Sequence, residues 1–201
     1  METTEILPPD SPFTLKVGET HMGLCAFEVR FGERAWRCQA SYVAEHPLSP
    51  LIHAAVELAT YFNDYPYAGD NAVVDVWDCL AADEPGGIVL RVIPLLGRAS
   101  SRVTVQVFHY LGGDLLPGPD KYPELPPEAE GMIAFDVFAR AVYASAADAL
   151  ARQGITQLSL EWESRLLSLD DSGMTVFPVE RFLQLHRQVH GATQRELSKG
   201  A

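Results

Sequence analysis

The chain has 201 residues, of which 15 are lysine or arginine and 27 are aspartate or glutamate, so its formal net charge is −12. Hydrophobic residues make up 47% of the sequence and charged residues 21%, which is typical of a globular protein and excludes a disordered or collagen-like chain. The acidic balance argues against general binding to nucleic acids or to anionic membranes, because both need a basic surface.

The two ends of the sequence are predicted to be tails. Residues 1–12 (METTEILPPDSP) have neither the basic region nor the apolar stretch of a secretory signal, and their prolines favour a disordered tail. Residues 191–201 are polar and form the second expected tail. We therefore expect a cytosolic protein with one domain over residues 13–190.

The first predicted unit is a β-hairpin of residues 24–31 and 34–42. The two segments flank Gly32-Glu33, and a glycine in the first position of such a pair is typical of a type II′ turn.

The register of this hairpin follows from its side chains. If Phe31 pairs with Arg34, Glu28 lies opposite Arg37 on one face and three apolar pairs share the other face. The apolar pairs are Cys25–Ala40, Phe27–Cys38 and Val29–Trp36. A slip of one residue would destroy both matches, so the sequence specifies one register.

A helix is predicted next, with Ser49 as its N-cap, Pro50 as its first helical residue and its end near Asn63. Apolar residues at helical spacing predict one face that packs on a sheet. They are Leu51, Ala54, Ala55, Leu58 and Phe62.

Three strands are predicted after this helix, over residues 72–80, 88–96 and 102–111. The EPGG segment at 84–87 has the proline and glycine positions of a type II turn. Because the links are short, we expect a mostly antiparallel meander that continues from the hairpin.

The remaining sequence divides into three parts. Residues 112–131 contain five prolines and four glycines, which predicts a long loop, and residues 132–152 predict a helix buried on several sides. Residues 155–177 fit both a strand and a helix; we favour a short hairpin there, followed by a last helix from Pro178.

Side chains that could carry chemistry do not form a recognisable site. His186 and His190 are four residues apart on a predicted helix, as two ligands of one metal would be, but the sequence indicates no third ligand. His109 is predicted to be a buried, hydrogen-bonded structural histidine. Cys25 and Cys38 are predicted to face the core, and the odd number of cysteines does not suit a disulfide framework.

Motifs for catalysis, cofactors and membranes are missing from the sequence as well. There is no glycine-rich phosphate loop before a helix and no nucleophile elbow. The most apolar stretch, 132–151, is interrupted by Asp136, Arg140 and Asp148, which argues against a membrane span. We therefore expect no enzyme activity, no metal and no cofactor.

Acidic and aromatic side chains gather in the predicted loops between residues 64 and 84. Such residues are the ingredients of a protein interface, with aromatic anchors and charges that steer a basic partner. The candidate partner-binding residues are Asp64, Tyr65, Tyr67, Asp70, Asp83 and Glu84. A solvated loop whose tyrosines cover the edge of the core is an equally good interpretation, and Trp77 is predicted to belong to the core.

The order of these features resembles a known family. The opening hairpin, the helix PLSPLIHAAVELATYF, the strand with Trp77 and the EPGG turn are followed by VTVQVFHYL and by FDVFARAVYASAADALARQG. This order is similar to the small cytosolic immunity proteins encoded beside bacterial polymorphic toxins, particularly the immunity partners of wall-associated toxins. The resemblance covers residues 13–153, whereas residues 155–190 and the proline-rich loop depart from the pattern.

The resemblance implies a non-catalytic protein that blocks a cognate toxin by binding it. An acidic surface would suit a nuclease toxin, whose substrate requires a basic surface. The alternatives are an adaptor or chaperone for a secreted effector and, less favoured, an unrecognised hydrolase. The sequence thus predicts an α+β fold, with a mainly antiparallel sheet packed on one face against helices. A toxin is the expected partner, nucleic acid and membrane are not, and a homodimer stays open.

Overall fold

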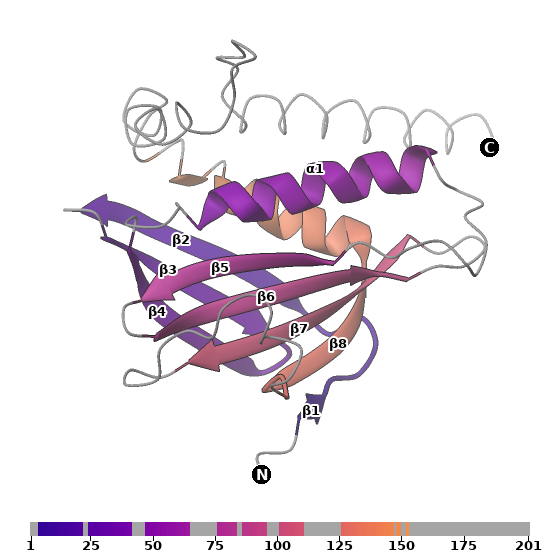
Figure 1. The fold of residues 1–201 in the computed structure, drawn as a ribbon, viewed down its shortest axis with the longest axis horizontal. Coiled ribbons are helices and arrows are strands. Elements are labelled where there is room, and N and C mark those ends of the chain that lie inside the picture. Colours follow the sequence, from indigo (N-terminus) through magenta and orange to yellow (C-terminus); the bar gives the residue numbers. More distant parts are fainter. Residues whose placement is uncertain are drawn as a thin grey trace.

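The computed structural model describes residues 4–21, 24–41, 47–64, 76–83, 86–95, 101–110, 126–146, 148–149 and 152. The strands and the labelled helix, in chain order, are β1 (Glu5–Ile6), β2 (Phe13–His21), β3 (Leu24–Phe31), β4 (Arg34–Ser41), α1 (Leu48–Asp64), β5 (Trp77–Asp83), β6 (Gly86–Pro94), β7 (Arg102–Tyr110) and β8 (Ala129–Ala134) (Figure 1). A second helix follows β8 directly and covers residues 135–146, with helical residues also at 148–149 and 152.

The predicted α+β class and the mainly antiparallel pairing are confirmed, but the strands form two sheets instead of one meander. One sheet has the order β1-β8-β7-β6-β5 and the other the order β2-β3-β4. β1 pairs with β8 in parallel, and every other described pairing is antiparallel. The 17-residue helix α1 lies between β4 and β5, so the hairpin need not continue directly into the meander.

The hairpin of β3 and β4 has the predicted register. Phe31 pairs with Arg34 and Glu28 with Arg37, and the three predicted apolar pairs are present. Gly32 has a φ of +61°, whereas Glu33 does not have a positive φ, which is the pattern of a type II′ turn. β2 adds a third strand that the sequence analysis did not predict.

The segment expected to be a disordered tail is ordered over residues 4–12. The amide of Leu7 donates to the carbonyl of Glu130 at 2.7 Å, and the amide of Asp10 donates to the carbonyl of Met132 at 2.9 Å. The Leu7 side chain is buried and lies against Gly32 and Gly131. An apolar residue that covers two glycines and pairs with a sheet edge holds this segment in place.

The boundary between β8 and the second helix differs from the prediction. Residues 129–131 were expected in the proline-rich loop and residues 132–134 in the helix, but both groups belong to β8. A Cβ at Gly131 would lie 2.5 Å from Cζ of Phe31. Gly131 therefore lets the two sheets approach each other closely. From the local sequence alone, this glycine is interpreted as a residue that ends regular structure.

Two other boundaries also shift. Asp83 pairs with Gly86 and Ala82 with Gly87, so both glycines of the EPGG segment belong to β6 instead of a type II turn. α1 begins at Leu48, before the predicted cap, which Pro50 permits because the first helical turn has no partners for its N–H groups.

The core lies where the two sheets and both helices meet. Figure 1 shows both helices on the same side of the five-stranded sheet. Alternate residues of β2, β3 and β7 are buried, and so are four of the five predicted apolar residues of α1. The fifth, Phe62, is partly buried, and its ring centroid lies 5.2 Å from that of Phe135. Cys25 and Cys38 face this core, as predicted, and Cys79 is buried as well. The main cluster is continuous across these elements, so the described part of the chain folds around one centre.

Candidate functional site

The outer face of the sheet β2-β3-β4 carries two rows of side chains that run across the strands. Lys16, Glu28 and Arg37 form a charged row, because Lys16 pairs with Glu28 and Glu28 with Arg37 in the register. Beside it lies a second row of Gly18, Ala26 and Gln39. Strand alternation turns both rows away from the core.

Glu28 is the electrostatic centre of the charged row. One of its carboxylate oxygens accepts a hydrogen bond from Nε of Arg37, and the other accepts one from Nε of Arg30. The hydrogen bond from Arg37, and then that from Arg30, holds the pKa of the Glu28 carboxyl below its ordinary value of 4.5. The carboxylate and the two guanidinium groups thus fix one another in position.

The lowered pKa of Glu28 predicts a stability effect that depends on pH. Because the carboxylate is favoured in the folded state, it stabilises the fold above pH 4.5, and this contribution is lost as the pH falls through the lowered pKa. We expect Glu28→Gln to lower the free energy of unfolding at pH 7 by about 1 kcal/mol, the size of an exposed ion-pair network, and the deficit to shrink as the pH falls below 4.5 through the lowered pKa. Urea unfolding of both proteins from pH 7 to pH 3 measures it.

The control for this prediction removes the cause of the shift. In a background carrying both Arg30→Gln and Arg37→Gln, the further change Glu28→Gln should have a similar, small effect at every pH. A deficit with the same pH dependence in both backgrounds would show that the two arginines are not its cause.

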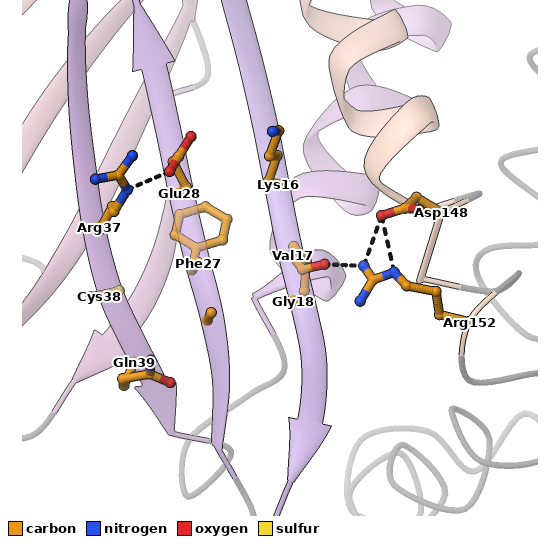
Figure 2. Close-up of a pocket in the computed structure, with 11 residues that line it drawn as sticks. Lys16, Val17, Gly18, Phe27, Glu28, Arg37, Cys38, Gln39, Asp148 and Arg152 are labelled. Carbon is orange, nitrogen blue, oxygen red and sulfur yellow. Dashed lines mark hydrogen bonds and ion pairs between the residues drawn. The ribbon is translucent and has the colours of Figure 1, made fainter.

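A depression of about 600 Å³ opens over these rows (Figure 2). Gly18 and Ala26 form its floor and leave the space above them open, because their side chains project little; a Cβ at Gly18 would lie only 2.9 Å from Cβ of Ala26. The second helix supplies one wall with Asp148 and Arg152. Nε and Nη2 of Arg152 lie 3.1 and 2.8 Å from Oδ2 of Asp148, and Nη2 also donates to the carbonyl oxygen of Val17.

A second polar cluster surrounds Glu128, just before β8. Its Oε2 accepts a hydrogen bond of 2.8 Å from Nε1 of Trp36 and lies 3.2 Å from Nη2 of Arg34. Arg34 also pairs with Glu5 and lies over the ring of Trp36 at 5.0 Å. These contacts join β1, β4 and β8, so the cluster ties the two sheets together.

His109 borders this cluster and is partly buried, and within the described residues its side chain does not make the expected hydrogen bond. Its Nδ1 lies 3.9 Å from Oε1 of Glu128, which is too long for a direct hydrogen bond. Glu128 is already engaged by Trp36 and Arg34. Within the described residues, His109 therefore lacks the tight carboxylate contact and the neighbouring nucleophile of a hydrolytic triad.

The structure describes two of the partner-binding residues proposed from the sequence, and it places these two far apart. Asp64 is the last residue of α1 and Asp83 the last of β5, and these ends lie on opposite sides of the molecule in Figure 1. The strand between Trp77 and Asp83 spans about 20 Å. The other candidates lie outside the described residues: Tyr65, Tyr67, Asp70 and Glu84. Trp77 is half-buried and packs against the main core, as expected.

The depression was not among the sequence-based candidates, although part of its pattern was visible. The Glu28–Arg37 pair was predicted from the hairpin register. The alternation of Phe13, Leu15 and Val17 is a signal in the sequence that places Lys16 on the outer face. Arg152 gives no local signal, because it contacts Val17 across 135 residues of sequence.

Within the described residues, no group of three or more His, Cys, Asp or Glu side chains could hold a metal ion. No described helix is both long and apolar enough to cross a membrane. His186, His190, the 155–177 segment, the last predicted helix and the polar C-terminal tail lie outside the described residues.

Comparison of the chain with protein-family models, with curated proteins and with solved structures finds no match.

Proposed function

We propose that this protein acts by binding another protein, without catalysis of its own. The observation that carries the proposal is the outer face of β2-β3-β4, where the Arg30–Glu28–Arg37 network fixes exposed charges on a rigid sheet. Charges that are already held in position lose little entropy on association, and they give a protein interface its specificity. The Glu128 cluster does not favour a hydrolase in the same way, because its polar groups pair with one another and join the two sheets.

The partner that we propose is a cognate bacterial toxin, which the chain neutralises by occupying its surface. The resemblance of the sequence pattern to immunity proteins supports this proposal, and so does the net charge of −12. The acidic residues between 64 and 84 would steer a basic toxin, with Tyr65 and Tyr67 as anchors. An adaptor or chaperone for a secreted effector is the alternative from the same binding class.

Capture and rescue test the immunity function. The tagged full-length protein is used to isolate its partner from the native cells, and the partner is then expressed in a bacterial host. We expect the partner alone to arrest growth and co-expression of this chain to restore growth. A partner without toxicity would favour the adaptor, whereas turnover of a small substrate without a partner would end the proposal.

Association kinetics with the captured toxin test the proposed interface. Asp70→Lys combined with Asp83→Lys should slow association about tenfold at low salt and flatten its salt dependence, because peripheral charges act mainly on encounter. The matched control is Glu33→Lys with Asp136→Lys, which changes the net charge equally at two exposed positions elsewhere in the chain. Equal slowing in both variants would mean that only the net charge matters.

A further inference from the structure

Both carboxylates that line the depression over β2-β3-β4 are paired with arginines, Glu28 with Arg30 and Arg37, and Asp148 with Arg152. Glu28 uses both carboxylate oxygens on Arg30 and Arg37. Within the described residues Arg37 makes its ion pair through Nε, and its side chain is 66% exposed, so its two terminal nitrogens remain accessible. The negative charge in the row is therefore already compensated, while donor capacity remains.

Lys16 adds a second source of positive charge. The seven arginines in the described part of the chain each form an ion pair: Arg30, Arg34, Arg37, Arg91, Arg102, Arg140 and Arg152. Lys16 is the described cation without one, even though acidic residues outnumber basic ones by 27 to 15 in the sequence. Its exposed ammonium group lines the depression.

We propose that this depression binds a carboxylate side chain from an acidic segment of a partner protein. The incoming carboxylate would lie above the shallow Gly18–Ala26 floor and accept hydrogen bonds from Lys16 and from the terminal nitrogens of Arg37. Such charge-assisted bonds are stronger than neutral ones, and an open sheet face admits a peptide chain across the strands. The inference rests on the proposed function as a protein-binding chain but not on the partner being a toxin.

The test uses hexaglutamate as the probe and hexaglutamine as its neutral control, with the full-length protein at low ionic strength. Two-dimensional NMR of the backbone amides should show shifts on adding hexaglutamate that centre on Lys16, Gly18, Ala26 and Gln39 and fade with added salt. Hexaglutamine should leave these signals in place. Shifts elsewhere, no shifts, or equal shifts with both peptides would overturn the proposal.

Two neutralising variants separate the site from the overall charge. Lys16→Gln should weaken hexaglutamate binding about fivefold, the upper range for one exposed ion pair, whereas Arg140→Gln on the exposed side of the second helix should change it little. Equal weakening by both variants would overturn the proposal. So would competition by inorganic phosphate at the concentration of the peptide, because the site would then recognise any small anion.

This result is distinguishable from that of the capture experiment. If a toxin is captured but hexaglutamate causes no NMR shifts at the depression, the proposed function is supported and the carboxylate site is refuted. Specific hexaglutamate binding by a chain that rescues no cell from its captured partner would do the reverse.

Discussion

Truncation of Phe138 to alanine should lower the free energy of unfolding by about 4 kcal/mol, within the range for a fully buried phenylalanine. Phe138 is on the second helix and is 0% exposed, and its ring centroid lies 6.0 Å from that of Phe13 on β2. The change would leave a cavity where the second helix meets the three-stranded sheet. Urea unfolding with an unchanged m-value measures the loss.

The matched control is Arg140→Ala on the same helix. Arg140 is exposed, and among the described residues it pairs with Asp136, one turn earlier, so its removal should cost about 0.5 kcal/mol or less. Similar losses for both variants would show that the second helix does not dock through Phe138. The comparison holds helix propensity almost constant, because phenylalanine and arginine differ little on that scale.

Arg91→Met should cost about 3 kcal/mol, because it leaves a carboxylate without its partner on the outer side of the five-stranded sheet. Arg91 is 8% exposed, and its Nε and Nη2 each lie 2.8 Å from an oxygen of Asp78 on the neighbouring strand. The guanidinium group also lies 5.5 Å from the ring of Phe108. Methionine retains the packing volume but neither the charge nor the two hydrogen bonds.

The double variant Arg91→Met with Asp78→Leu separates the charge from the packing. It should recover most of the lost stability, since a buried ion pair replaced by apolar side chains of similar size is often nearly neutral. A double variant as unstable as Arg91→Met would show that the arginine contributes through its packing on Phe108. Both proteins can be compared by chemical unfolding at pH 7.

The sequence by itself determined the elements whose partners are near in the chain. The β3–β4 register follows from Glu28, Arg37 and the apolar pairs, because a two-residue turn leaves the strands few alternative alignments. The buried stripe of α1 and the alternation of β7 were likewise predictable, since each depends on the period of one element against the core. These are local patterns, and a local interpretation is sufficient for them.

Only the tertiary structure decided the division into two sheets and the position of the candidate site. β1 pairs with β8 across more than a hundred residues. Residue 131 of β8 is a glycine because Phe31, from the other sheet, occupies the space that a Cβ would need. Similarly, Arg152 reaches the carbonyl of Val17 and forms a wall of the depression over β2-β3-β4. Such contacts depend on how faces pack in three dimensions, and no periodicity within one segment specifies which distant segment will fill a given space.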